Sequence, residues 1–413
     1  MKILILTQYF PPEIGAPQNR LFEIALRLSR KDVDVTILTA MPNYPQMEIH
    51  VGYKRKFYKY EVMEGLKIHR CWIYVGKSKS IPLRLLNYFS FMFSSFFIGL
   101  FKLSKYDYIL CESPPLFLGI SAYFLSRIKG AKMIFNVSDL WPESADKLGL
   151  VTNKFFLRLS TKLEEFLYRK SFLITGQTQG IVKNISARFP DKKIYWLPNG
   201  VDIDLFQIDK YRNNWKNENR FAKDDFILLY AGIIGHAQGL KIILNAAKRL
   251  LLYPNIKFVI IGSGPEKENL KILKEKDNIY NVFFMDSVPK IKMPIIIDSI
   301  DAAIIPLKRL ELFKGAIPSK IFETLAMNKP LLLGVEGEAK ELFIDEAKGG
   351  LAFEPENDQD LAIKVLELYN NPELRNSLGN NGFNYVKQNF SRDLIADKFW
   401  KFLNEMDNIV KDK

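Results

Sequence analysis

Short apolar runs rich in Ile, Leu and Val alternate with longer amphipathic stretches from one end of the chain to the other. Runs of this length are typical of strands buried on both faces, and the stretches between them carry helical spacing. The alternation predicts an α/β fold in which helices cover both faces of parallel sheets. The predicted strands are residues 3–6, 33–38, 68–74, 108–111, 133–137, 172–175 and 194–197, then 227–230, 258–261, 282–284, 302–306, 331–335 and 351–353.

The two groups of strands predict two doubly wound, Rossmann-like domains that face each other across a cleft. We place the domains at residues 1–200 and 201–390, with the polar stretch 203–224 as the linker. A helix over residues 391–413 has apolar positions on one face, and we expect it to pack back toward the first domain. A chain of 413 residues is long enough for two such domains.

Loops that follow strands are the places to search for function. Ligands of open parallel sheets lie outside the carboxyl ends of the strands. Two such sheets facing each other predict two opposed ligand sites, which is the arrangement that an enzyme transferring a group between two substrates needs.

The first domain has two candidate loops. Gly15 and Ala16 follow the first strand and open a helix, where free backbone N–H groups and the helix dipole favour a phosphate. An ordinary proline-rich turn is the alternative, and the G-x-G-x-x-G spacing of nicotinamide-binding sites is absent. Asp139 ends an apolar strand, a position where a carboxylate is more often functional than structural.

The second domain has a glycine-rich loop after its first strand, with Gly232, Gly235 and Gly239, and a second tight turn at Gly264. Glycines at a strand-to-helix turn let the backbone approach a ligand closely. His236 lies in the first of these loops, and taken alone it fits a structural role better than a catalytic one.

A predicted helix start at Pro318-Ser319 carries Lys320 and Glu323 on one face. The lysine can meet a diphosphate, and the carboxylate can accept hydrogen bonds from ribose hydroxyls. The alternative is an exposed ion pair that only stabilises the helix.

The excess of positive charge lies in the first half of the chain. The net charge is +13, and residues 1–200 hold 29 Lys and Arg against 15 Asp and Glu, which leaves the second half near neutral. The densest basic stretch is 54–84. No RNP-like aromatic strand, zinc-finger spacing or helix-turn-helix accompanies it, so we expect an anionic membrane surface and no nucleic acid as partner.

Residues 85–101 contain no charge and include six phenylalanines. Three interpretations remain open: a buried core helix, an interfacial helix whose aromatic face enters a bilayer, and a membrane-spanning segment, for which the run is short.

Composition excludes several classes of protein and site. With 48% hydrophobic and 25% charged residues, disordered and fibrous classes are excluded. Two cysteines and three scattered histidines predict neither a disulfide framework nor a metal site. The apolar run at the N-terminus is shorter than a signal peptide requires, so a reducing, cytoplasmic compartment is expected.

The order of these motifs resembles that of family 4 glycosyltransferases. The motifs are the glycine loop after the first strand, Asp139-Leu-Trp-Pro-Glu-Ser, Leu197-Pro-Asn-Gly-Val-Asp202, the glycine-rich loop of the second half and Pro318-Ser-Lys-x-x-Glu. The resemblance covers essentially the whole chain. It implies the GT-B fold, with an acceptor-binding first domain and a nucleotide-sugar-binding second domain. It also implies a retaining hexosyltransferase that uses a nucleotide-sugar donor, a UDP-sugar, without a metal or other cofactor.

The same resemblance assigns roles to individual residues. Gly15 approaches the donor diphosphate, Lys320 binds a donor phosphate, Glu323 binds the ribose and Asp139 lies beside the transferred sugar. Asp139 and Lys320 are therefore the expected catalytic residues. The expected donor-binding set also includes Ala16, Gly232, Gly235, His236, Gln238, Gly239, Gly264, Val288 and Ser319.

Three positions depart from the family pattern. Ile233 and Gln238 stand where the arginine and lysine of G-R-x-x-x-x-K-G bind phosphate, and Gly315 replaces the first glutamate of E-x7-E. The changes resemble the branch that includes N-acetyl-L-fucosamine transferases of O-antigen and capsule assembly. Lys320, Gln238 and backbone N–H groups would then neutralise the leaving diphosphate.

By this resemblance the enzyme moves an N-acetylated or deoxy sugar to a polyprenyl-diphosphate-linked saccharide in O-antigen, lipopolysaccharide or capsule assembly. It would act as a peripheral protein on the inner face of the plasma membrane. Two alternatives remain: a nucleotide-sugar epimerase of the same fold, which would release free sugar, and a non-catalytic nucleotide-sugar-binding scaffold.

Overall fold

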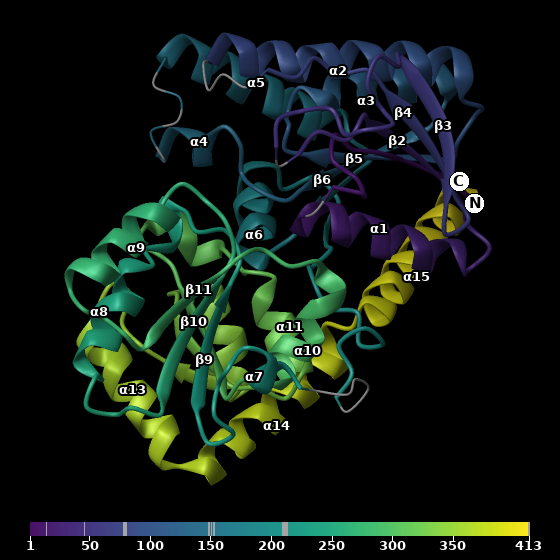
Figure 1. Cartoon of the computed structure of the whole chain (residues 1–413). Coiled ribbons are helices and arrows are strands. Elements are labelled where there is room, and N and C mark those ends of the chain that lie inside the picture. The colour runs from purple at the N-terminus through teal and green to yellow at the C-terminus, as the bar shows by residue number, and fades with distance from the viewer. Residues whose placement is uncertain are drawn as a thin grey trace. The chain divides into compact units, whose positions relative to one another are not determined.

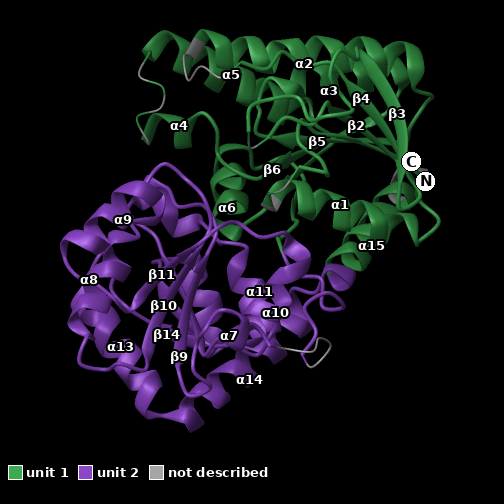
Figure 2. Cartoon of the chain, viewed as in Figure 1, with its two compact units in different colours: residues 1–199, 395–413 green, residues 200–394 purple. Residues whose placement is uncertain are grey.

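All the predicted strands are present in the computed structural model, where they form two separate sheets (Figure 1). The structure describes residues 1–13, 15–44, 46–76, 81–147, 149, 151, 153–208 and 214–411. Unit 1 comprises Met1–Asn199 and Ile395–Lys413, and unit 2 comprises Gly200–Leu394 (Figure 2). The chain leaves unit 1 after Asn199 and returns to it inside the last helix, α15 (Arg392–Lys411).

Unit 1 contains an eight-stranded sheet in the order β3-β4-β2-β1-β5-β6-β7-β8. The strand order reverses at β1, which pairs in parallel with β2 on one side and β5 on the other. In doubly wound sheets ligands bind at such a reversal, beyond the carboxyl ends of the strands. The strands are β1 (Lys2–Leu6), β2 (Asp34–Ala40), β3 (Tyr58–Met63), β4 (Leu66–Cys71), β5 (Tyr108–Ser113), β6 (Lys132–Val137), β7 (Leu173–Gly176) and β8 (Ile194–Trp196).

The prediction of parallel strands alone is wrong at one edge of this sheet. β3 pairs with β4 in an antiparallel hairpin, and the turn is made by Glu64 and Gly65, both with positive φ. β3 escaped the sequence analysis because it is not an apolar run. Half-buried Lys59 and Glu61 alternate with exposed Tyr60 and Val62, and such a mixture of charged and apolar residues gives no apolar run.

Helices cover both faces of the sheet in unit 1. α1 (Ala16–Ser29) and α15 pack on one face, where Leu21, Phe399 and Leu403 share a core with strand residues. The other face carries α2 (Ile81–Lys102), α3 (Leu118–Lys129), α5 (Lys154–Lys170) and α6 (Gln179–Arg188), and the short α4 (Glu143–Lys147) follows β6. Asn153 and Thr178 cap α5 and α6 by accepting hydrogen bonds from the first turn of each helix.

Helix α2 packs with its small polar residues inward. Asn87, Ser90, Ser94 and Ser95 are all buried. Ser95 lies 3.1 Å from the hydroxyl of Ser121 in α3, and the other three hydrogen-bond to the backbone that follows β4. Phe91 is buried in the core of unit 1, whereas Phe93, Phe97 and Phe101 are exposed, so α2 acts as a core helix on one face only.

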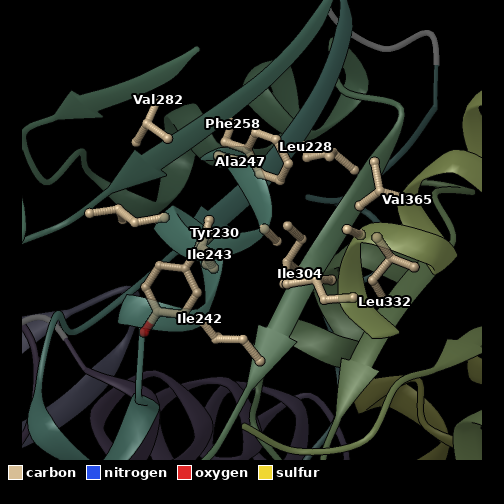
Figure 3. Close-up of a cluster of buried hydrophobic side chains, with 14 of the residues drawn as sticks. Leu228, Tyr230, Ile242, Ile243, Ala247, Phe258, Val282, Ile304, Leu332 and Val365 are labelled. Carbon is tan, nitrogen blue, oxygen red and sulfur yellow. The ribbon is translucent and has the colours of Figure 1, made fainter. Parts of the chain in front are cut away.

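Unit 2 contains a six-stranded parallel sheet in the order β11-β10-β9-β12-β13-β14, which reverses at β9. α8 (Lys241–Arg249), α9 (Lys267–Lys276) and α13 (Asp358–Asn370) build the core on one face (Figure 3). The strands are β9 (Phe226–Ala231), β10 (Ile256–Ile261), β11 (Val282–Met285), β12 (Ala302–Pro306), β13 (Leu331–Gly334) and β14 (Gly350–Ala352).

The remaining helices of unit 2 are short, apart from α14, and α11 packs near β12, β13 and α14. They are α7 (Trp215–Glu218), α10 (Met293–Asp298), α11 (Lys320–Ala326), α12 (Glu338–Lys340) and α14 (Pro372–Asn389). Single turns occur at η1 (His236–Gln238), η2 (Lys290–Lys292) and η3 (Glu311–Gly315), and η4 (Glu341–Glu346) is a π-helix.

The stretch 203–224, predicted as a linker, belongs to unit 2 in its described part. Phe206, Trp215 and Phe221 are buried there. The rings of Trp215 and Phe221 stack with centroids 5.6 Å apart, and Phe221 also packs against Phe283 of β11. The polar composition of the stretch hid these three anchoring side chains, so the linker prediction is wrong for these residues.

Candidate functional site

Two glycine loops lie against each other at the carboxyl edge of the sheet in unit 2. They follow the neighbouring strands β9 and β10. The N–H of Gly232 donates to Ile261 O at 2.9 Å, and the N–H of Ile234 donates to Ser263 O at 2.9 Å. The N–H of Glu266 returns a third bond to Ile234 O at 3.1 Å. The two loops therefore form one rigid backbone platform.

Glycine is required where the loops meet. Gly262 has φ +153°, and a Cβ there would lie 1.8 Å from the carbonyl oxygen of Gly232. Gly264, one of the predicted donor-binding residues, has φ +157°, and its Cβ would lie 2.3 Å from Ile234 O. Side chains at either position would force the loops apart.

Lys320 is the first residue of α11, and its ammonium lies over the ring of Tyr230 at the end of β9. The distance from Nζ to the ring centroid is 3.8 Å. The Tyr230 hydroxyl donates to Ile233 O at 2.6 Å, so the same side chain also holds the glycine loop. Tyr230 is among the core residues labelled in Figure 3. Gly232 leaves room for the ammonium, because a Cβ there would lie 2.8 Å from Nζ.

The charge of Lys320 is poorly compensated. Within the residues that the structure describes, its ammonium makes no hydrogen bond or ion pair. Burial lowers its pKa to about 7, and the nearby charge of Glu323 opposes the shift only in part. A cation over an aromatic ring, with unused N–H donors beside a backbone platform, is suited to an anionic oxygen.

Glu323 lies one turn further along α11, and its partner is a different lysine. Lys290 Nζ, from the segment after β11, is 3.8 Å from Glu323 Oε1. The alternative of a stabilising pair between Lys320 and Glu323 is therefore not realised in the structure. Val288 lies half-buried two residues before Lys290, and Ser319 directly precedes α11 without capping it through its side chain.

The rest of the glycine-rich loop forms η1. His236 is exposed, and its Nδ1 lies 3.1 Å from Glu266 Oε1, which is a structural contact between the two loops. The side chain of Gln238 folds over Gly235, where a Cβ would come within 2.9 Å of Gln238 Oε1. Gly239 ends the turn in the left-handed conformation, with φ +59°.

Gly315, which departs from the family pattern, ends η3. A Cβ at this position would meet no atom of the described chain within 4 Å. The loop thus has room for the side chain that the family pattern places there.

Unit 1 holds Gly15, Ala16 and Asp139 of the predicted residues. Gly15 precedes α1 in an extended conformation, and a Cβ there would lie 2.3 Å from Gln18 Oε1. Ala16 begins the helix. Glu13, just before them, accepts from the backbone N–H groups of Asn43 and Tyr44 at 2.7 and 2.8 Å, which ties the loop after β1 to the loop after β2.

Asp139 lies at the same edge of the sheet, after β6. Its carboxylate accepts from Ser144 Oγ at 2.9 Å. Desolvation of the carboxyl raises its pKa, while the bonds from Ser144 and from the Leu140 N–H act in the opposite direction. The carboxylate is held at the end of a short loop, and the residue is exposed.

A buried polar network beneath Asp139 was missed by the sequence analysis. Arg20 of α1 donates to Glu112 at the end of β5 at 2.6 Å and to Ser138 Oγ at 2.7 Å, and both charged side chains are almost fully buried. Glu112 also accepts from Asn136 and Ser138. The available signal was a glutamate inside an apolar strand. The network fixes Ser138, and therefore the start of the loop that carries Asp139.

The described residues include no group of three or more His, Cys, Asp or Glu side chains placed to hold a metal ion. The polar groups gathered at the sheet edges are instead a lysine, two carboxylates and backbone N–H groups. Such groups suit the binding of phosphates and hydroxyls.

Two family models match this chain. Residues 18–205 match the model described as Glycosyltransferase Family 4, and residues 211–385 match Glycosyl transferases group 1.

Relatives and solved structures extend over most of the chain. The chain is 28% identical to the Escherichia coli K12 protein named "Putative colanic acid biosynthesis glycosyl transferase WcaI", over 88% of this chain and 91% of that protein. The structure is similar to sucrose-phosphate synthase of Thermosynechococcus elongatus, with a TM-score of 0.75, 13% identity and 99% of each chain covered. It is also similar to Anabaena Alr3699/HepE in complex with UDP and glucose, with a TM-score of 0.72, 15% identity and 98% and 100% of the two chains covered.

Proposed function

Because this chain is a glycosyltransferase with the GT-B fold, we propose that it builds a cell-surface polysaccharide by transferring a sugar from a nucleotide-diphosphate donor to a lipid-linked saccharide. Unit 2 would bind the donor, a UDP-sugar, and unit 1 the acceptor. The named relative in colanic acid biosynthesis and the neighbour crystallised with UDP support this proposal. We place the chain in the branch that transfers N-acetylated or deoxy sugars.

The observation that carries the donor assignment is the uncompensated ammonium of Lys320 beside two fused glycine loops. A donor diphosphate would accept hydrogen bonds from Lys320 and from loop amides. These donors would take the place of the arginine and lysine of the family pattern, whose positions are occupied by Ile233 and Gln238. Glu323, one turn along α11, would accept hydrogen bonds from ribose hydroxyls.

The proposed reaction retains the configuration of the transferred sugar and uses no metal. The bond between the anomeric carbon and the donor phosphate oxygen breaks, and the acceptor hydroxyl oxygen bonds to that carbon on the same face. The acceptor proton passes to the leaving phosphate oxygen. Lys320 would stabilise the leaving charge, and the Asp139 carboxylate would orient the sugar and stabilise positive charge at the anomeric carbon.

The test is turnover of a panel of UDP-sugars with and without a prenyl-diphosphate-linked saccharide. Transfer to the saccharide supports the proposal. Release of free sugar without acceptor would indicate an epimerase, and donor binding without turnover would indicate a scaffold. Lys320→Met should weaken donor binding strongly, whereas Lys276→Met, at the exposed end of α9, is the matched control and should bind as the parent does.

We also propose that unit 1 docks on the inner face of the plasma membrane through α2, α3 and α5. The polarity of α2 supports this placement, since buried serines face inward while Phe93, Phe97 and Phe101 are 56%, 51% and 76% exposed. Residues Pro82–Lys102 meet the length and composition of a spanning helix, as core helices also do. Because α2 packs along the surface of unit 1, we favour an interfacial position.

Aromatic contacts join the outer sides of the three helices. Phe96 of α2 contacts Phe124 of α3, with ring centroids 6.3 Å apart. Tyr123 contacts both Phe124 and Phe166 of α5, at 5.3 and 5.0 Å. The exposed side chains of this face are Leu86, Phe93, Phe97, Phe101, Phe124, Ile128, Phe155, Leu159 and Phe166. Exposed apolar side chains grouped on three neighbouring helices are typical of an interaction surface.

The charge of the three helices selects an anionic bilayer as the occupant. They carry nine Lys and Arg residues and two Glu, and one of the glutamates, Glu164, is buried and paired with Arg188. Basic residues beside an inserted apolar face bind anionic headgroups with about 1 kcal/mol each.

Co-sedimentation with phosphatidylglycerol-containing vesicles tests the docking. Vesicle binding should have a component that salt screens and a component that salt does not affect. Arg158→Gln with Lys162→Gln should weaken binding at low salt, because surface charge drives the first component. Phe93→Ser with Phe97→Ser should remove the second component, which comes from insertion of the aromatic side chains. Leu252→Ser with Ile272→Ser, two exposed apolar residues of unit 2, is the matched control. Absence of binding to anionic vesicles at low salt would refute the docking proposal.

A further inference from the structure

A pocket of about 260 Å³ opens at the carboxyl edge of the sheet in unit 1. It is built where β2 and β4 end and β3 begins. Met41 directly follows β2 and donates to Cys71 O at 2.9 Å, and Trp72 directly follows β4 and donates to Phe57 O at 2.9 Å. This is the edge at which parallel sheets bind ligands, and it is also the edge that carries Asp139.

One wall of the pocket is an aromatic platform. The rings of Phe57 and Trp72 stack with centroids 6.1 Å apart and an angle of 12° between their planes. Although they are large and apolar, they are 64% and 40% exposed. Met41 and Ile73, both buried, form the floor. The exposed faces of such rings attract the C–H groups of a sugar ring, which carry partial positive charge.

Two cations line the same pocket without an anionic partner. Arg55 and Lys56 are exposed, and within the described residues neither makes an ion pair or a side-chain hydrogen bond. Their neighbours differ, since Lys54 pairs with Glu48 at 2.7 Å and Lys59 pairs with Glu61 at 2.7 Å. The pocket therefore combines an aromatic platform with two cations that form no ion pair with any described residue.

The platform is anchored to the helix that we place at the membrane. The Ser94 hydroxyl of α2 donates to the carbonyl oxygen of Trp72. Two residues on, the backbone N–H of Tyr74 donates to Ser90 Oγ at 2.9 Å and its carbonyl accepts from Asn87 at 2.6 Å. The inward polar residues of α2 thus fix the segment that carries Trp72.

We propose that this pocket binds the saccharide and diphosphate of the lipid-linked acceptor, with the sugar on Phe57 and Trp72 and the diphosphate on Arg55 and Lys56. The inference rests on the proposed function and names the acceptor-binding residues of unit 1. Its volume lies below the roughly 300–1,000 Å³ of sites that enclose drug-sized ligands. We therefore assign to it only one sugar ring and the diphosphate, which are a part of the acceptor.

Binding of farnesyl-diphosphate-linked N-acetylglucosamine, measured by calorimetry, tests the pocket. Trp72→Ala should weaken binding at least tenfold, as central aromatic contacts do, and Trp72→Phe should stay within about threefold of the parent. Arg55→Gln with Lys56→Gln should weaken binding and remove its salt dependence. Lys67→Gln, which removes one positive charge near the other end of β4, is the control for loss of surface charge outside the pocket. None of these variants should change the affinity for a UDP-sugar.

Two further ligands test whether the phosphate in this pocket belongs to the lipid-linked acceptor, to a free sugar phosphate or to the nucleotide. N-acetylglucosamine 1-phosphate and UDP should bind the pocket more weakly than the farnesyl-linked saccharide, and equal competition by either would overturn the assignment to the acceptor. Unchanged binding by Trp72→Ala and by the double Gln variant would also overturn it. Failure of the proposed function looks different, because the parent enzyme would then transfer no sugar to the farnesyl-linked saccharide.

Discussion

Donor binding should take up a proton at Lys320, and this can be measured. The ammonium lies over Tyr230 with a pKa of about 7, whereas a lysine in water titrates near 10.5. Burial also raises the pKa of Tyr230, so that hydroxyl stays neutral throughout the pH range of interest. The charge of Glu323 opposes the lowering of the pKa of Lys320, and Glu323 itself pairs with Lys290. A bound diphosphate would return the pKa of Lys320 to its usual range or above it.

The expected magnitude follows from the pKa of the free protein. At pH 8.5 only about 3% of Lys320 is charged before binding, so nearly one proton enters with each donor molecule. At pH 6 the lysine is already charged and uptake is close to zero. The charged fraction of Lys320 falls from about one half at pH 7 to about 3% at pH 8.5, so affinity should fall roughly 16-fold between these pH values and about tenfold for each further pH unit.

Calorimetry with UDP-N-acetylglucosamine in two buffers of different ionisation enthalpy measures this proton uptake. The diphosphate of the ligand does not titrate between pH 6 and 8.5, so the uptake belongs to the protein. Lys320→Arg should bind without proton uptake, since a guanidinium remains charged. Lys320→Met should bind weakly at every pH. A parent affinity that is flat from pH 6 to 8.5, with no proton uptake, would refute the reasoning.

Three further changes test other parts of the structure. Lys320→Met should raise the free energy of unfolding at pH 7 by up to about 5 kcal/mol. The pKa of Lys320 is lower in the folded protein than in the unfolded chain. The extra stability of the variant over the parent, measured by thermal unfolding, should therefore shrink as pH rises toward 10.5. Asp139→Asn should lower kcat about tenfold or more while the protein stays folded, and loss of fold with normal activity in the folded fraction would make Asp139 structural. Arg20→Met should destabilise unit 1 by about 3–5 kcal/mol in denaturant unfolding, because Glu112 is left buried and unpaired, and adding Glu112→Met should recover part of that loss.

The periodicity of the chain predicted the sheets well because buried parallel strands are continuous apolar runs. β3 was missed since an edge strand need not be apolar, although the Glu64-Gly65 turn was a usable signal. The segment around Trp215 was taken for a linker because composition averages over single buried anchors.

The candidate site was predictable only in part. The loop glycines and Lys320 could be found in the sequence, since strand-to-helix turns mark them. The placement of the Lys320 ammonium over Tyr230 depends on how the start of α11 packs against the sheet, and no local pattern contains that information. The same is true of the pair between Arg20 and Glu112, which are 92 residues apart.

The return of the chain into unit 1 governs the order in which this protein can fold during synthesis. Phe399 and Leu403 complete the core beneath β1, and Asp407 accepts from the Tyr108 hydroxyl at 2.6 Å. A ribosome releases these residues about 200 residues after the rest of unit 1. Unit 2, whose residues are continuous in sequence, can close first, while the nascent unit 1 keeps one apolar face uncovered until the last helix arrives. Residues 1–199 produced alone would carry that exposed face permanently and should aggregate.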